Sequence, residues 1–64
     1  MLVLELERRK QGKTQAEVAI ASHVDPAYIC RAEKSGLAFP GHLERLASAL
    51  HWRGEPADLL KEVN

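Results

Sequence analysis

Two helix-start signals lie close together in residues 14–35, which read TQAEVAIASHVDPAYICRAEKS. The first is Thr14, a residue type whose side chain accepts a hydrogen bond from the backbone at the start of a helix. Glu17 follows at the spacing in which the two side chains cap each other's backbone N–H groups. The pattern predicts a helix over about residues 14–22.

The second signal begins shortly after the end of that helix. Asp25 is a good capping residue, and Pro26 occupies the first helical position, where its missing N–H costs nothing. Gly36 suits the left-handed residue that ends many helices. We therefore expect a helix over about residues 26–35, joined to the preceding one by a short linker at residues 23–25.

Three further helices are expected around this pair. The first covers about residues 2–11 and ends at Gly12, and the fourth is entered through Pro40 and stops near His51. The fourth carries apolar residues at the i, i+3, i+4, i+7 spacing of a helix: Leu43, Leu46, Ala47 and Leu50. A fifth, short helix is expected over about residues 56–63. No segment shows the alternating pattern of a β-strand, so the expected fold class is all-α.

Length and composition allow one small domain. The 64 residues are 45% hydrophobic and 28% charged, and a chain of this size buries only ~60% of its unfolded surface. Such a core leaves no room for a deep cofactor pocket beside a substrate cleft. We therefore expect residues 1–64 to form a single compact five-helix domain that is not an enzyme, takes no cofactor and binds no small-molecule ligand.

Charge and cysteine content narrow the expected setting. Nine basic residues balance nine acidic ones, so the strongly basic balance of many nucleic-acid-binding domains is absent and any charge argument must be local. Cys30 is the single cysteine, which excludes a disulfide framework and a cysteine-rich zinc site and is typical of a reducing, cytoplasmic protein. No apolar stretch approaches the ~18 residues of a membrane span, so neither a membrane nor export is expected.

The two faces of the predicted helix at residues 26–35 differ in chemistry. Successive residues of a helix are rotated by ~100° about its axis. With Ile29 taken as buried, Ala27 and Arg31 fall almost on the opposite side of the helix. Lys34 flanks them. The exposed ridge of this helix is therefore small, basic and narrow enough to approach the edges of DNA bases.

The same rotation turns Glu33 toward the buried side, where an unpaired carboxylate is costly. Arg8 lies one turn after Leu4, on the apolar side of the first predicted helix. We therefore predict a salt bridge between Arg8 and Glu33. Its expected role is to orient the helix that carries Glu33 rather than to add net stability, because burial of a charge pair costs much of its attraction.

The order of residue types along the chain is distinctive: Thr14-Gln15, Val24-Asp25, Tyr28-Ile29, Arg31 with Glu33, and Leu46-Ala47-Ser48-Ala49-Leu50. Over about residues 4–60 this order resembles the Cro and phage-repressor-like (XRE-type) helix-turn-helix family. The resemblance implies a lambda-repressor-like domain and likewise pairs Arg8 with Glu33. It also implies a sequence-specific transcriptional regulator of double-stranded DNA, a dimeric repressor that reads an inverted repeat through the helix at residues 26–35. On helix spacing alone, an ordinary helical hairpin is the alternative.

This hypothesis assigns roles to individual residues. Arg31 can donate twice to guanine and Ala27 can contact a thymine methyl, although Arg31 can also be a phosphate ligand or a solvated charge. Gln15, on the first turn of its helix, is expected to hold a phosphate, or else simply to start the helix. The full set of expected phosphate contacts is Lys13, Thr14, Gln15, Tyr28, Lys34 and His42.

Several residues depart from the pattern of the family, among them His23, Pro26 and Ala27. His23 stands at a turn position that is usually glycine, where a left-handed backbone strains a bulky residue. Pro26 and Ala27 replace polar side chains often used to read bases, so DNA preference is expected to depend on Arg31 and on DNA shape. Pro26, Ala27 and the zero net charge favour an alternative function, a protein-interaction module or anti-regulator that keeps the fold without binding DNA.

The carboxy-terminal segment is rich in apolar side chains that have little left to cover: Trp52, Leu59, Leu60 and Val63. Trp is enriched among the anchor residues of interfaces, and helix-turn-helix repressors bind paired half-sites. We therefore expect a homodimer through this surface. The alternative is that Trp52 covers the core of a single subunit.

Overall fold

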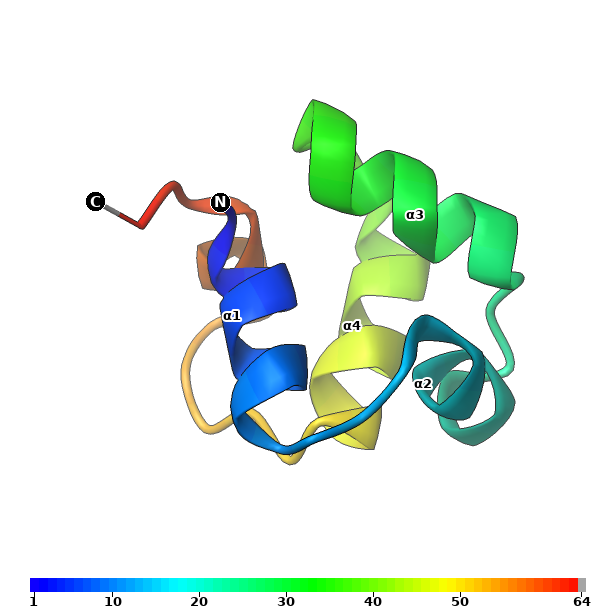
Figure 1. Ribbon diagram of the computed structural model, residues 1–64. Helices are drawn as coiled ribbons and strands as arrows, with labels where there is room; N and C mark the ends of the chain where they lie inside the picture. The colour runs from blue at the N-terminus through cyan, green and yellow to red at the C-terminus, as the bar shows by residue number, and fades with distance from the viewer. Residues whose placement is uncertain (64) are drawn as a thin grey trace.

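The computed structural model describes residues 1–63. It contains four α-helices and a 3₁₀ helix: α1 Val3–Lys10, α2 Gln15–Ser22, α3 Pro26–Ser35, α4 Pro40–Ala49 and η1 Pro56–Leu60. Helix α4 packs against α2 and η1, α2 packs against α3, and α1 packs against η1 (Figure 1). The described residues hold no β-strand beyond one isolated bridge, so the all-α class is confirmed.

Both helix-start signals form the expected hydrogen bonds. The Thr14 hydroxyl accepts from the Glu17 N–H at 3.1 Å, and the Glu17 carboxylate accepts from the Thr14 N–H at 2.9 Å. Hydrogen bonding of the Glu17 carboxylate to the Thr14 backbone, and secondarily to the Thr14 side chain, lowers the pKa of Glu17, because it stabilises the charged carboxylate. At the start of α3, the Asp25 carboxylate accepts from the Ala27 N–H at 2.7 Å. Both predicted starts are therefore confirmed.

Each α-helix is followed within two residues by a residue with a left-handed backbone: Gly12 (φ 68°), His23 (φ 57°), Gly36 (φ 74°) and His51 (φ 55°). At His23 the turn is closed by the Val24 N–H, which donates to the Ala19 carbonyl at 3.3 Å. His23 thus adopts the conformation that favours glycine, with its side chain exposed. The linker between α2 and α3 keeps a tight turn at the cost of local strain.

Every helix contributes to one apolar core. The largest fully buried side chains are Leu4, Val18, Ile29, Leu46, Leu50 and Leu59. Buried Ser22 is accommodated because its hydroxyl donates to the Val18 carbonyl at 2.6 Å. Within residues 1–63, no buried side-chain polar atom lacks a hydrogen-bond partner. In α3, Ile29 and Ala32 lie in this core, whereas Ala27 and Arg31 on the opposite side of the helix are exposed.

The short fifth helix predicted over about residues 56–63 is wrong in length, and no α-helix forms there. The segment forms only the 3₁₀ helix η1, and Lys61 turns to extended backbone (φ −77°, ψ 147°). The Lys61 carbonyl then accepts from the Val3 N–H at 2.9 Å, and the Val63 N–H donates to the Met1 carbonyl at 2.9 Å. The first backbone N–H groups of a helix have no hydrogen-bond partner within it. The residues after Leu60 therefore pair with the start of α1 instead of forming another turn of helix.

We expect His23→Gly to stabilise the domain by up to about 1 kcal/mol. A left-handed non-glycine residue costs roughly 1–2 kcal/mol, and the greater freedom of glycine in the unfolded chain offsets part of the gain. Urea unfolding of the two proteins measures the difference. The matched control is Ala21→Gly, at an exposed position inside α2, which we expect to destabilise by about 1 kcal/mol. Equal destabilisation by both changes would show that His23 is unstrained.

Candidate nucleic-acid interface

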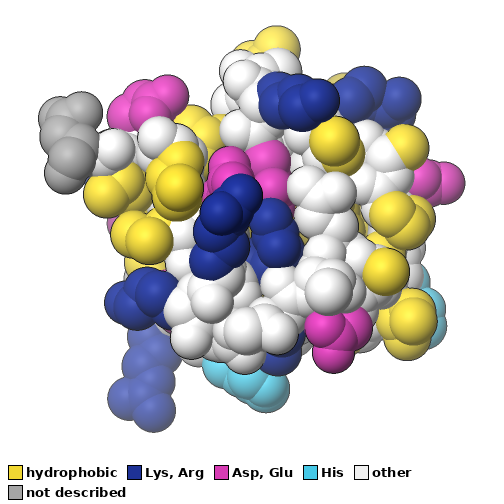
Figure 2. Space-filling model, viewed as in Figure 1, with side chains coloured by type: hydrophobic (Ala, Val, Ile, Leu, Met, Phe, Trp, Pro, Cys, Tyr) yellow, Lys and Arg dark blue, Asp and Glu magenta, His cyan; other side chains and the backbone are white. Residues whose placement is uncertain are grey.

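Helix α3 presents one buried and one exposed face. Ile29 and Ala32 are 0% and 1% exposed, whereas Ala27, Arg31 and Lys34 are exposed. Figure 2 shows Lys and Arg side chains over this helix and at its junction with α1. The assignment of residues to the two faces of α3 is confirmed by their burial, and two cations lie along a narrow exposed ridge.

The inner face of α3 also carries a buried carboxylate. Glu33 is only 8% exposed, and its two oxygens accept from Arg8 Nε at 2.8 Å and from Arg8 Nη2 at 3.1 Å. This bidentate hydrogen bonding to Glu33 raises the pKa of the Arg8 guanidinium. The salt bridge expected between Arg8 and Glu33 is therefore present, and it joins α1 to α3.

Gln15 is the third member of this cluster. Its side-chain Nε2 donates to Glu33 Oε1 at 2.9 Å, so the carboxylate also joins α2 to α3. Arg8 Nη1 donates to the Lys13 carbonyl at 2.9 Å, which holds the loop before α2. The sequence analysis missed this use of Gln15, because only the packing of α2 on α3 brings residues so far apart in the chain together. One amide hydrogen of Gln15 satisfies Glu33, which leaves its second for another acceptor.

Two other expected phosphate contacts at the start of α2 have bonds within the chain. The Thr14 hydroxyl serves the capping box with Glu17. Lys13 Nζ donates to the Ala49 carbonyl at 3.3 Å, at the carboxyl end of α4, where a cation offsets the negative end of the helix dipole. The first backbone amides of α2, from Gln15 onward, remain the nearest anion-binding groups at this end of the helix.

Tyr28 and His42 are brought together where α3 meets the start of α4. Their rings stack with centroids 4.4 Å apart and planes at 21°. The Tyr28 hydroxyl accepts from the Phe39 N–H at 2.7 Å and so satisfies the backbone amide of the residue that precedes α4. The hydroxyl proton of Tyr28 can still be donated to an outside acceptor.

The carboxy-terminal residues expected at a dimer interface are buried within the single subunit to different degrees. Leu59 is fully buried, so the expectation that it contacts a partner is wrong: contact of η1 with α1 and α4 encloses it. Trp52 is half-buried against the core, and its Nε1 donates to the Glu55 carbonyl at 3.0 Å. Leu60 and Val63 remain partly exposed.

Large exposed apolar side chains lie elsewhere, at Met1 (51%), Ile20 (77%), Leu37 (76%) and Phe39 (68%). Leu37 and Phe39 were missed, although two bulky apolar residues in the short connector between α3 and α4 are a signal that the sequence offers.

Residues 1–63 contain neither a metal-binding cluster nor a membrane-spanning helix. No group of three or more His, Cys, Asp or Glu side chains is arranged to hold a metal ion there. None of the described helices has the length and apolar character to cross a membrane. Comparison with models of protein families, with curated proteins and with solved structures finds no match. The chemistry of the α3 face is therefore the basis for any functional assignment.

We expect the Arg8–Glu33 pair to show strong coupling in unfolding. Arg8→Met leaves a buried carboxylate with Gln15 as its remaining side-chain partner and should cost about 3 kcal/mol, since removal of one member of a buried pair typically costs roughly 3–5 kcal/mol. The double variant Arg8→Met, Glu33→Met should cost less than Arg8→Met alone, because no charge is then left unpaired. Urea unfolding measures the wild-type chain, both single variants, Arg8→Met and Glu33→Met, and the double variant. Additive losses would contradict the structural importance of the pair.

Proposed function

We propose that the chain is a sequence-specific DNA-binding transcriptional regulator that places α3 in the major groove of double-stranded DNA. The observation that carries this proposal is the outer ridge of α3, where Ala27, Arg31 and Lys34 are exposed while the inner face is held by the core and by Glu33. A helix held in this way presents the same few side chains in a fixed direction, which base readout requires.

Base readout centres on Arg31. Its guanidinium can donate to O6 and N7 of one guanine, a contact worth roughly 1–3 kcal/mol against the wrong base. Ala27, one turn earlier on the exposed ridge, offers a methyl group to thymine. Lys34 follows at the other end of the ridge and provides charge for the phosphate backbone.

The phosphate contacts flank α3 on two sides. On the α2 side, the second amide hydrogen of Gln15 and the first backbone amides of α2 are the proposed donors to one phosphate, with Lys13 and Thr14 beside them. On the α4 side, the Tyr28 hydroxyl and His42 stand at the positive end of the α4 dipole. These local groups supply the attraction that a chain of zero net charge lacks as a whole.

The arrangement also supports the proposed membership in the Cro and phage-repressor-like family. The capping box opens α2, a three-residue linker precedes α3, and a salt bridge joins Arg8 to Glu33. Such domains act as repressors on paired half-sites, so we propose a cytoplasmic, dimeric repressor that reads an inverted repeat. The dimer surface retains Trp52, Leu60 and Val63, without Leu59.

A protein-interaction module or anti-regulator is the second candidate function. The exposed Leu37 and Phe39, next to the α3 ridge, favour it, because a contiguous apolar surface marks a protein contact. The two functions differ in their response to salt. Binding to phosphates weakens steeply as salt rises, whereas apolar docking does not.

The first experiment selects duplexes from a random DNA pool at low salt. We expect a symmetric motif, and we expect Arg31→Ala to lose one base preference at a cost of roughly 1–3 kcal/mol. Lys34→Ala should instead weaken all sequences alike and reduce the salt slope by about 1. Arg53→Ala, in the loop between α4 and η1, is the matched control and should change neither. A flat pool with the wild-type chain would reject the regulator and favour the interaction module.

The dimer is tested by sedimentation at increasing concentration. We expect the 7.1 kDa chain to sediment as a species of twice that mass, and Val63→Asp to shift it toward the monomer, because a charge in an apolar contact is costly. Ile20→Asp, on the exposed side of α2, should leave the equilibrium unchanged. Circular dichroism verifies that both variants stay folded. A monomer at every concentration would exclude the dimer.

A further inference from the structure

The connector between α3 and α4 forms an exposed apolar surface, which we call the loop patch: Tyr28, Leu37, Ala38 and Phe39. These four residues line a shallow hollow of about 410 Å³. Leu37 and Phe39 are 76% and 68% exposed, whereas Tyr28 forms the side of the hollow with its ring stacked on His42. Two large apolar side chains held this far into water on one connector call for a partner that covers them.

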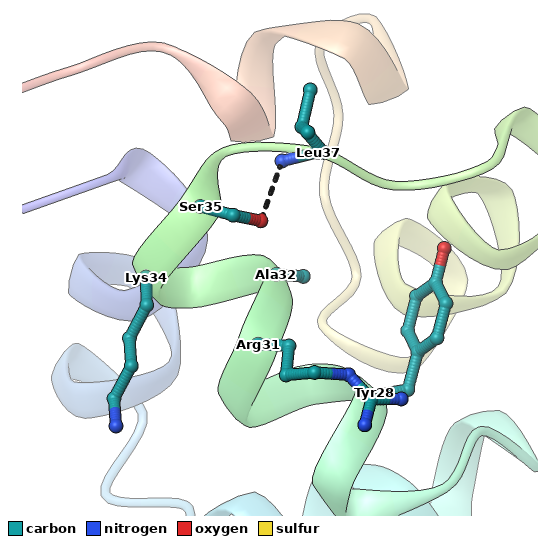
Figure 3. Close-up of a pocket in the computed structure, with 6 residues that line it drawn as sticks. All are labelled: Tyr28, Arg31, Ala32, Lys34, Ser35 and Leu37. Carbon is teal, nitrogen blue, oxygen red and sulfur yellow. Dashed lines mark hydrogen bonds between the residues drawn. The ribbon is translucent and has the colours of Figure 1, made fainter.

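A second hollow of about 370 Å³ adjoins the loop patch and carries charge. Figure 3 shows its lining, in which Tyr28 and Leu37 stand around Ala32, Arg31 extends toward Tyr28, and Lys34 extends along the other side of α3. The lining contains these two cations and no carboxylate. The Ser35 hydroxyl accepts from the Leu37 N–H at 3.2 Å, which fixes the direction in which the connector leaves α3. The loop patch thus has a cationic margin.

This combination of apolar surface and cations discriminates between possible occupants. A second copy docked face to face would bring Arg31 and Lys34 against the same two cations of its partner, and like charges repel. A phosphate backbone suits the cations, but it is charged and hydrated and gains nothing from Leu37 and Phe39. A peptide that carries both carboxylates and a large apolar side chain satisfies both halves of the surface.

We propose that the loop patch and its cationic margin bind an acidic segment of a partner protein that carries a large apolar anchor residue. The anchor packs between Leu37 and Phe39, and carboxylates of the segment pair with Arg31 and Lys34. Arg31 is also the proposed base-reading residue, so a bound segment excludes DNA. In this one respect the inference rests on the proposed function. The partner is then an inhibitor of the DNA-binding face.

The test begins without DNA. Short random peptides displayed on phage are selected on the wild-type chain, with counter-selection on the Leu37→Ser, Phe39→Ser double variant. We expect the enriched peptides to contain several Asp or Glu residues and at least one Leu, Phe or Trp. A labelled synthetic peptide from this set should bind the double variant and Arg31→Ala at least about tenfold more weakly than the wild-type chain, as for the loss of an anchor contact.

Ile20→Ser is the matched control, because Ile20 is as exposed as Leu37 but lies on α2. Its affinity for the peptide should equal that of the wild-type chain. Circular dichroism verifies that every variant is folded. Failure to enrich any peptide against the double variant, enrichment of peptides without acidic residues, or equal weakening by Ile20→Ser would each overturn the proposal.

A competition assay then connects the peptide to DNA. The peptide should displace a labelled duplex taken from the DNA selection, and simultaneous binding of both would overturn the inhibitory role. A loss of DNA affinity in the double variant, with no peptide enriched, would assign the loop patch to the DNA interface instead. A wild-type chain that binds no DNA would reject the proposed function and the competition, whereas the directly measured peptide binding would stand.

Discussion

The buried carboxylate of Glu33 is the constraint on which the arrangement of the helices depends. A carboxylate at 8% exposure must be paired, and the groups that pair it come from two other helices: Arg8 of α1 and Gln15 of α2. Arg8 also holds the Lys13 carbonyl in the loop before α2. Together with the apolar core, this single charge on α3 therefore sets the position of the helix relative to α1 and α2.

This constraint gives the outer ridge of α3 its fixed direction. Ile29 and Ala32 anchor the helix in the core, and Glu33 sets its rotation, so Ala27 and Arg31 project away from the domain. The zero net charge of the chain is compatible with anion binding, because many of its charges are paired with one another, as in the Arg9–Glu5 and Lys61–Asp58 pairs, while Arg31 and Lys34 stay on the ridge. A local cationic surface needs no global excess of charge.

The ridge and the loop patch are adjacent surfaces of different chemistry, and Arg31 and Lys34 belong both to the ridge and to the cationic margin of the loop patch. The ridge suits an anionic groove, whereas the loop patch adds Leu37 and Phe39 to the same cations. Such an overlap lets a protein partner switch off a DNA-binding regulator directly, because two ligands cannot contact the same side chains at once. The two candidate functions of this chain are therefore compatible with each other.

Local chemistry determined the helices and their faces. Thr14, Glu17 and Asp25 cap the helices at their own positions, and the spacing of Ile29 and Arg31 assigns them to opposite sides, because capping and helical rotation act within a few residues. Tertiary structure alone decided that Gln15 shares Glu33 with Arg8, that Leu59 is enclosed by the subunit, and that the chain after Leu60 pairs with Met1 and Val3 instead of extending a helix. Those outcomes depend on which groups distant in the chain meet when the helices pack, and on the need to satisfy every backbone amide left open at a helix end.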